Sequence, residues 1–120
     1  MKLEKILGNH TIVEFYGCLP SIISDSKKVE EAFLEAARLS HARIIDSNFH
    51  YFKPYGVSGV VIIAESHFSV HTWPEYNYAA IDFFSCSDVI DVDSALNYLK
   101  SVFLPQDVKI THLVRGIVKT

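Results

Sequence analysis

The sequence has few cysteines, no cluster of basic residues and no long apolar run. Only Cys18 and Cys86 among the 120 residues are cysteines, so two free thiols are expected rather than a disulfide. The net charge is -3, which argues against the salt-dependent phosphate binding of a nucleic-acid-binding protein. Residues 1–8 are too short and too charged for a signal peptide, and no segment approaches membrane-spanning length. We therefore expect a cytoplasmic protein that binds neither nucleic acid nor membrane.

The chain is long and apolar enough for one domain with its own core. Its hydrophobic content is 49%, and no internal repeat, low-complexity segment or linker divides residues 1–120. The residue patterns predict strands over 9–16, 43–52, 57–64, 67–73, 78–85 and 107–115, and helices over 26–40 and 93–103. This order, βαββββαβ, predicts an α+β two-layer sandwich, a largely antiparallel sheet covered on one face by two helices. A second copy could cover the other sheet face.

The two strands at residues 67–85 are expected to form a hairpin, because Pro74 and Asn77 in the connection are turn residues. Symmetric closure of this hairpin pairs Trp73 with Tyr78. The strand before it, residues 57–64, is almost wholly apolar and β-branched, as is typical of a strand buried on both faces.

The hairpin register predicts which polar groups share a neighbourhood. The next pair outward brings Cys86 opposite Glu65, so the thiol lies beside the peptide bond that follows Glu65. If the strands at residues 57–64 and 67–73 are joined by a turn at Glu65 and Ser66, Val60 faces His71. Ser58 then falls on the same side of the sheet as His71, one alternate position along.

A serine in a tight turn after a carboxylic residue, with imidazole, hydroxyl and thiol groups nearby, suits self-processing. The Ser66 hydroxyl would attack the carbonyl of Glu65 and convert the peptide bond into an ester. Removal of the α-proton of residue 66 would eliminate the ester, and the dehydroalanine left behind would hydrolyse to a pyruvoyl group. Such a carbonyl forms a Schiff base with a substrate amine and accepts the electrons released on decarboxylation. Cleavage would yield fragments 1–65 and 66–120.

The segments that carry this chemistry resemble a known family. The run GVSGVVIIAESHFSVHTWPEYNYAAIDFFSC, with FHYFKPYG before it and GNHTIVEFYGC near the N-terminus, is similar to the small prokaryotic S-adenosylmethionine decarboxylase proenzymes. The resemblance extends from about Leu7 to Cys86, and the ESH and HTWPEY segments are highly specific. It implies a pyruvoyl cofactor formed from Ser66 and no metal. It also implies a homodimer that converts S-adenosylmethionine to decarboxylated S-adenosylmethionine for polyamine (spermidine) biosynthesis.

The resemblance further implies roles for catalytic residues. Self-cleavage would occur between Glu65 and Ser66. His71 would be the base that drives the elimination, and Ser58 would steady the cyclic intermediate of the acyl shift. Cys86 would protonate the α-carbon after carbon dioxide leaves.

Substrate contacts are implied in the same way. Glu75 would bind the ribose hydroxyls, and Phe52 would stack on the adenine. Three positions depart from many relatives: Asn9 stands where Arg is common, and Asn77 and His41 stand where Gly is common.

The residues also admit other functions. A pyruvoyl-dependent decarboxylase of ornithine or arginine would use the same processing residues. On a helix, His67, His71 and Glu75 would share one face as a metal site, but the β-branched neighbours favour a strand, on which residues four apart are separated by about 13 Å. A cysteine hydrolase using Cys86 and His71 would leave Ser66 without a role. A pure binding module is expected only if Ser66 never processes.

Overall fold

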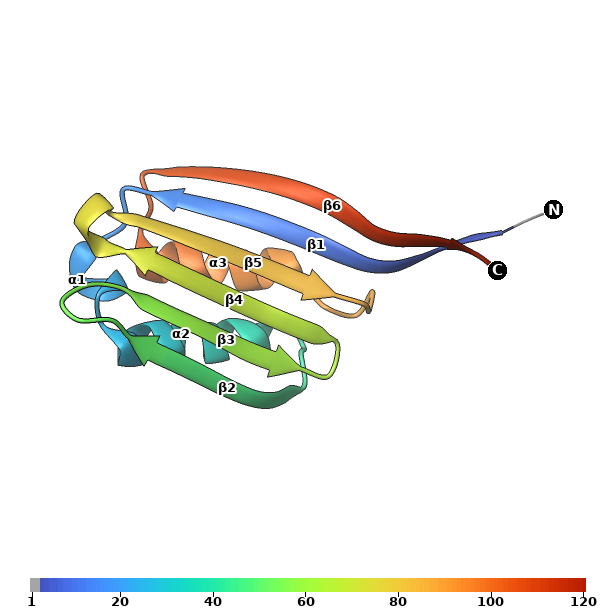
Figure 1. The fold of residues 1–120 in the computed structure, drawn as a ribbon, viewed down its shortest axis with the longest axis horizontal. Coiled ribbons are helices and arrows are strands. Elements are labelled where there is room, and N and C mark those ends of the chain that lie inside the picture. The colour runs from blue at the N-terminus through green and yellow to red at the C-terminus, as the bar shows by residue number, and fades with distance from the viewer. Residues whose placement is uncertain (1–2) are drawn as a thin grey trace.

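A computed structural model describes residues 3–120, and six strands of this part form one antiparallel sheet (Figure 1). The strands are β1 (Glu4–Tyr16), β2 (Ile44–Tyr51), β3 (Val57–Ile63), β4 (Ser66–Trp73), β5 (Tyr78–Ser85) and β6 (Asp107–Lys119). Their order across the sheet is β2-β3-β4-β5-β1-β6. Met1 and Lys2, which begin the predicted domain and the predicted fragment 1–65, lie outside the described residues.

The helices cover one face of the sheet, which confirms the α+β class (Figure 1). They are α1 (Pro20–Ile23), α2 (Ser26–Leu39) and α3 (Val92–Phe103), and a short 3-10 turn, η1 (Pro74–Tyr76), joins β4 to β5. The predicted order lacked α1, because a four-residue helix is too short to show a helical period. No helix in the described range is both long and apolar enough to cross a membrane.

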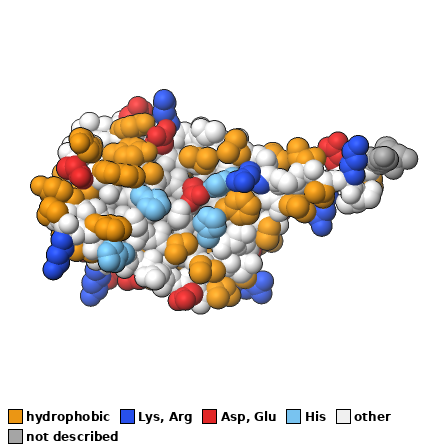
Figure 2. Space-filling view, viewed as in Figure 1, with side chains coloured by type: hydrophobic (Ala, Val, Ile, Leu, Met, Phe, Trp, Pro, Cys, Tyr) orange, Lys and Arg blue, Asp and Glu red, His pale blue; other side chains and the backbone are white. Residues whose placement is uncertain are grey.

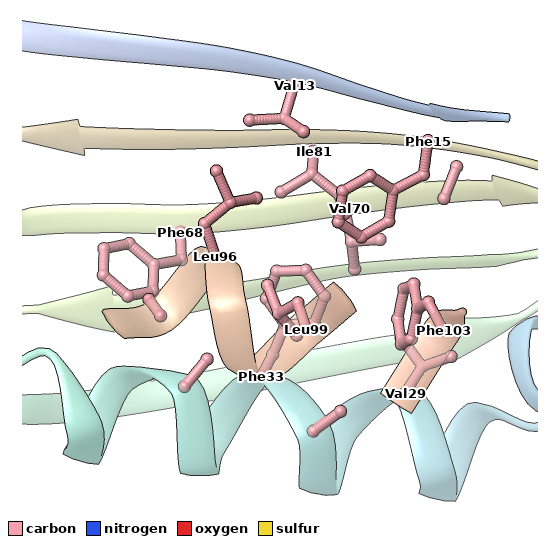
Figure 3. Packing of buried hydrophobic residues seen from close by; sticks show 14 of the residues in the cluster. Val13, Phe15, Val29, Phe33, Phe68, Val70, Ile81, Leu96, Leu99 and Phe103 are labelled. Atoms are coloured by element: carbon pink, nitrogen blue, oxygen red, sulfur yellow. The ribbon is translucent and has the colours of Figure 1, made fainter. Parts of the chain in front are cut away.

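The hydrophobic core lies between the helices and the sheet. Figure 3 shows Phe33 of α2 and Leu99 and Phe103 of α3 packed beneath the apolar side chains of the central strands. Each of these three side chains is fully buried, which contributes roughly 2–3 kcal/mol apiece. Cys18 belongs to the same core, and its burial raises the pKa of the thiol to about 11. Cys18 is therefore a small core residue.

β1 and β6 continue past the other strands as a two-stranded arm, residues 4–8 and 115–119 (Figure 1). They pair from Glu4 opposite Lys119 onward, whereas β5 joins β1 only from Asn9. The arm makes the molecule 56 Å long. The sequence predicted strands only over 9–16 and 107–115, because Gly8 and Gly116 interrupt the apolar pattern, and Gly116 takes a φ of +69°.

The second face of the sheet has no helix on it, and we call it the open face. Figure 2 shows this face, where histidine side chains gather over the middle and apolar side chains lie around them and along the arm. Ile62 of β3 points to it and is 44% exposed. The prediction that residues 57–64 are buried on both faces is therefore wrong for the single chain.

Candidate active site

The hairpin between β4 and β5 has the predicted register. Trp73 pairs with Tyr78, and the ladder continues to Ser66 opposite Ser85. One step further, the Cys86 backbone N–H donates a hydrogen bond of 2.9 Å to the Glu65 carbonyl oxygen. The residue that carries the thiol therefore lies directly beside the Glu65–Ser66 peptide bond.

The β3–β4 register differs from the prediction by two residues. Ser58 pairs with His71, and Ile63 pairs with Ser66, so the turn consists of Ala64 and Glu65. The predicted partner of His71 was Val60. No glycine, proline or asparagine marks this turn, so its position could not be predicted from the residue pattern. The shift is even, so the predicted placement of Ser58 on the same side as His71 is confirmed.

Ser58 and His71 are in direct contact on the open face. The Ser58 Oγ lies 2.8 Å from Nδ1 of His71, across the β3–β4 ladder. The hydrogen bond fixes the orientation of the imidazole ring, and it leaves Nε2 free to face a reacting group. This geometry fits a base with a supporting hydroxyl.

Ser66 has an unusual backbone conformation for a residue with a side chain. Its φ is +145°, a region occupied almost only by glycine. Such a conformation costs of order 1–3 kcal/mol and persists where the surroundings impose it. The strained residue stands directly after the tight Ala64–Glu65 turn, at the bond predicted to be cleaved.

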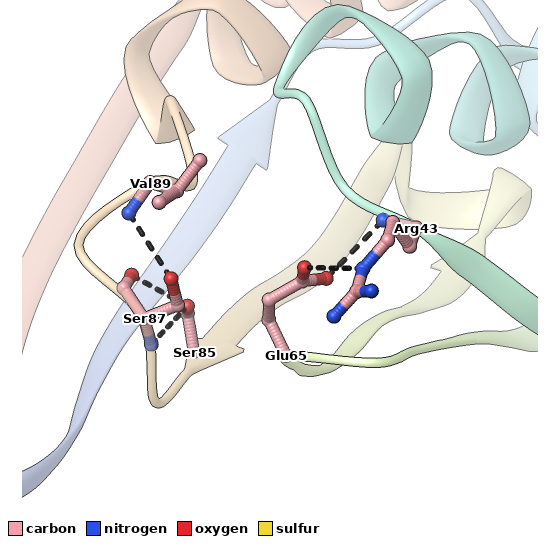
Figure 4. Close-up of polar contacts among 5 residues, drawn as sticks. All are labelled: Arg43, Glu65, Ser85, Ser87 and Val89. Atoms are coloured by element: carbon pink, nitrogen blue, oxygen red, sulfur yellow. Dashed lines mark hydrogen bonds and ion pairs between the residues drawn. The ribbon is translucent and has the colours of Figure 1, made fainter.

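The Glu65 side chain holds one side of this turn (Figure 4). Its carboxylate accepts a hydrogen bond of 3.2 Å from the Arg43 backbone N–H and one of 3.5 Å from Arg43 Nε. Desolvation raises the pKa of the Glu65 carboxyl, but the hydrogen bonds and charge of Arg43 outweigh it, and the pKa is lowered. Glu65 is thus anchored as a carboxylate to the segment that precedes β2.

Hydrogen bonds hold the loop after β5, the segment that carries Cys86; Figure 4 shows those among Ser85, Ser87 and Val89. Ser85 Oγ donates to the Ser87 carbonyl and accepts from the Ser87 N–H, at 3.0 and 3.1 Å. Ser87 Oγ in turn accepts from the Val89 N–H at 3.1 Å. These bonds hold the backbone on both sides of Cys86, whose side chain is exposed.

The predicted substrate-binding residues lie together at the other end of β4. Phe52, Ser58, His71 and Glu75 line one cavity of about 240 Å³. Phe52 is half exposed, and its ring contacts His50 edge-on at 4.5 Å between centroids. An aromatic face and a carboxylate therefore border the pocket into which the Ser58–His71 pair faces.

Within one chain, Ser66 and Cys86 lie far from the Ser58–His71 pair. Ser66 and His71 are five residues apart on β4, which corresponds to about 17 Å of strand. Cys86 lies beyond Ser66, so within one chain it is also remote from His71, and the cysteine hydrolase loses its base. The strand likewise separates His67 from His71 by about 13 Å, too far for one metal ion.

Sequence reasoning missed a polar cluster in the middle of the open face. Asp82 accepts hydrogen bonds from Ser69 Oγ and from His10 Nε2, the latter at 2.6 Å. Arg115 Nη1 lies 3.1 Å from His10 Nδ1, and His67 Nε2 lies 3.7 Å from Asp82. Burial raises the pKa of the Asp82 carboxyl, but the hydrogen bonds from Ser69 and His10 and the charges of His67 and His10 outweigh it, and the pKa is lowered. His10 and Asp82 are 72 residues apart in the sequence, so only the β1–β5 register could have revealed that they pair.

Comparisons with known proteins agree with this fold. The family described as S-adenosylmethionine decarboxylase matches residues 9–116. A protein of Acidithiobacillus ferrooxidans named S-adenosylmethionine decarboxylase proenzyme is 50% identical over 110 residues, which are 92% of this chain and 83% of that protein. One of the same name from Moorella thermoacetica is 45% identical over 96% of this chain and 92% of its own length.

A solved structure agrees as well. The crystal structure of the adenosylmethionine decarboxylase from Aquifex aeolicus matches with a TM-score of 0.88 and 32% identity, over 95% of this chain and 94% of that one. The chain belongs to the S-adenosylmethionine decarboxylase family.

Proposed function

We propose that this protein is a self-processing, pyruvoyl-dependent decarboxylase that converts S-adenosylmethionine to decarboxylated S-adenosylmethionine for polyamine synthesis. The observation that carries the proposal is the Glu65–Ser66 bond, which follows a tight turn at a strained serine and whose carbonyl oxygen accepts a hydrogen bond from the Cys86 backbone N–H. The names of the family's members as proenzymes support it.

The processing reaction starts with attack of Ser66 Oγ on the carbonyl carbon of Glu65. The new C–O bond replaces the C–N bond of the peptide, so residue 66 gains a free amino group and the strained φ of +145° is released. A base then takes the α-proton of residue 66, and Glu65 leaves as a carboxylate. Hydrolysis of the remaining dehydroalanine releases ammonia and forms the pyruvoyl group.

His71 is the base in this proposal, and Ser58 sets its tautomer. A base must offer an unprotonated nitrogen to the reacting carbon. If Nδ1 of His71 carries the hydrogen and donates it to Ser58 Oγ, Nε2 is the free acceptor. The hydroxyl thereby keeps the basic nitrogen aimed into the pocket.

The separation of the two groups within one chain implies that two copies build each site. A two-fold axis between two open faces, perpendicular to the strands, reverses strand direction. When this axis crosses β4 midway between Ser66 and His71, it places the Ser66 and Cys86 of one copy over the Ser58 and His71 of the other. The uncovered open face, on which Ile62 is 44% exposed, supplies the apolar area that such a dimer needs. We propose a homodimer with two composite sites.

The pocket residues suit an adenosyl substrate. Phe52 offers a ring face to the adenine and the sulfonium charge, and Glu75 offers a carboxylate to the ribose hydroxyls. A pyruvoyl group at residue 66 supplies a carbonyl that binds the substrate amine and accepts electrons as carbon dioxide leaves. Cys86, next to the cleaved bond, then returns a proton to the substrate α-carbon.

The alternative substrate is a basic amino acid, because the processing residues do not determine what enters the pocket. Release of carbon dioxide should be measured with S-adenosylmethionine, ornithine and arginine in parallel. We expect release from S-adenosylmethionine alone, and none from a Ser66→Ala variant. Release from ornithine or arginine, without any from S-adenosylmethionine, would contradict the proposed substrate while leaving the pyruvoyl chemistry in place.

A further inference from the structure

The arm carries apolar side chains on the side that continues the open face. Ile6 and Ile117 pair across the arm and are 51% and 60% exposed, and Leu113 lies further along the same side of β6. Figure 2 shows apolar side chains along the projecting arm. A two-stranded ribbon is at best marginally stable in water by itself, so this surface is suited to a covering partner.

A second exposed apolar surface lies at the opposite end of the sheet. Tyr16, Trp73, Tyr76 and Tyr78 border one hollow of about 340 Å³, and we call them the aromatic cluster. The ring centroid of Tyr78 lies 5.3 Å from that of Tyr16 and 5.5 Å from that of Trp73. Tyr76 is 76% exposed. Large aromatic side chains gathered in this way are typical of the centre of an interface.

The charges at the two ends are of opposite sign. On the arm, Lys5, Arg115 and Lys119 outnumber Glu4. Beside the aromatic cluster lie the acidic residues Glu14, Glu75 and Asp107 and the basic residue Lys109, so negative charge is in excess there. Glu14 accepts hydrogen bonds from the hydroxyls of both Tyr16 and Tyr78, so it is fixed within the cluster. The two ends are therefore complementary in charge.

The ladder registers bring these ends together in the proposed dimer. Ser66 and Asn9 are level across the sheet, because both pair with Ser85. Trp73 and Tyr16 are level, because both pair with Tyr78. If Ser66 of one copy lies over His71 of the other, a step of two residues brings the second copy's Trp73 and Tyr16 level with residue 7 of the first, and Tyr16, which is on β1 as residue 7 is, lies over it. Residue 7 is in the arm.

We propose that the arm of each copy packs on the aromatic cluster of the other copy, and so covers the end of the partner's sheet that borders Glu75. This inference rests on the dimer in the proposed function. It adds a second contact region to the open face, one at each end of the two-fold interface, with Ile6 and Ile117 against the tyrosines and Trp73. The partner is a second copy of this chain.

Cross-linking tests the contact directly. In a Cys86→Ser background, which removes the exposed native thiol, Ile6→Cys and Tyr16→Cys are combined in one chain and treated with a short bifunctional maleimide. Within one chain these positions are ten residues apart on β1, or about 34 Å, so a link can form only between copies. We expect most of the protein to become a covalent dimer.

The matched control replaces Ile6→Cys by Leu39→Cys, an exposed position on the helix layer. We expect no covalent dimer from it. No covalent dimer above this control, in protein that light scattering reports as dimeric, would overturn the arm contact. Carbon dioxide release by the protein with its native Cys86 would then leave the proposed function standing. If light scattering reports a monomer, the arm contact and the dimer are both overturned. The decarboxylation assay tests the enzymatic activity separately from either of them.

A second readout uses Trp73, the single tryptophan of the chain. Its indole is 41% exposed in one copy and lies 5.5 Å from the Tyr78 ring in the aromatic cluster, so the partner's arm would shield the cluster to which it belongs. Acrylamide quenching of its fluorescence should rise about twofold or more in an Ile6→Asp, Ile117→Asp variant. Charged side chains on the arm would not pack on the aromatic cluster, so the quencher would reach Trp73 more easily. The control is Ile45→Asp. Ile45 is 66% exposed, somewhat more than Ile6 and Ile117, and lies on β2 at the other edge of the sheet. Equal quenching in all three proteins would contradict the contact.

Discussion

The hydroxyl of Ser58 lies 2.8 Å from Nδ1 of His71, on the open face at the end of β4 remote from Ser66. This pair is held by two neighbouring strands, so its geometry depends on sheet register rather than on a mobile loop. In the proposed composite site, one copy supplies the base and its supporting hydroxyl, and the other copy supplies the scissile bond and Cys86.

Loss of either member of the pair should slow self-cleavage by different amounts. We expect His71→Ala to slow it by about 10²–10⁴-fold, the usual contribution of a general base. Ser58→Ala should slow it less, by about tenfold, because the imidazole remains but its tautomer is no longer fixed. Densitometry of the two fragments over time gives both rates. Ser101→Ala, an exposed helix position, serves as the control, and an equal rate in all proteins would remove His71 from the mechanism.

The strained backbone at Ser66 makes a prediction about stability. Ser66→Ala and Ser66→Gly should both block cleavage, because neither has a hydroxyl. Glycine adopts a φ of +145° without a steric penalty, so the Gly variant should be the more stable by about 1 kcal/mol, or about 4 °C in Tm. Thermal unfolding of the two uncleaved proteins measures the difference. A more stable Ala variant would show that the turn carries no strain at this residue.

Glu75→Gln should separate substrate binding from processing. The variant keeps the Ser58–His71 pair, so we expect normal cleavage. Its KM for S-adenosylmethionine should rise about tenfold or more, because an amide oxygen accepts weaker hydrogen bonds from the ribose hydroxyls than a carboxylate does. Steady-state release of carbon dioxide gives KM, and Glu31→Gln on the exposed side of α2 is the matched control. An unchanged KM would contradict ribose binding by Glu75.

Asp82 makes a prediction about acid stability. Its partners lower the pKa of its carboxyl in the folded protein. A carboxyl whose pKa is lower in the folded protein than in the unfolded chain stabilises the fold at pH values above its unfolded pKa of about 4. This contribution is lost as the pH falls through the folded pKa. Asp82→Asn should therefore be less stable than the wild type at pH 7 and lose less stability on acidification. Urea unfolding at pH 7 and at pH 3 tests this, with exposed Asp88→Asn as the control; parallel pH profiles for Asp82→Asn and the wild type would contradict it.

The success of the sequence reasoning followed the strength of local signals. Pro74 and Asn77 marked the β4–β5 turn, so the register that brings Cys86 to Glu65 was predicted correctly. Ala64 and Glu65 carry no turn signal, so the β3–β4 register was wrong by two residues. The side on which Ser58 lies was still correct, because an even shift preserves the face.

Contacts between distant segments were beyond the sequence. The arm depends on pairing between β1 and β6, whose partners are about a hundred residues apart, and its glycines hide the strand pattern. The His10–Asp82 pair and the Arg43–Glu65 pair likewise appear only once the strand order is known. The separation of Ser66 from His71 was implicit in the strand assignment, since strand length alone sets it.

The central claim is cleavage at Glu65–Ser66 with formation of a pyruvoyl group, and an intact mass spectrum of the purified protein tests it most directly. The account predicts two fragments, 1–65 with an ordinary carboxyl terminus and 66–120 lighter than its encoded mass by the elements of ammonia. A single full-length mass that persists on prolonged incubation would contradict self-processing.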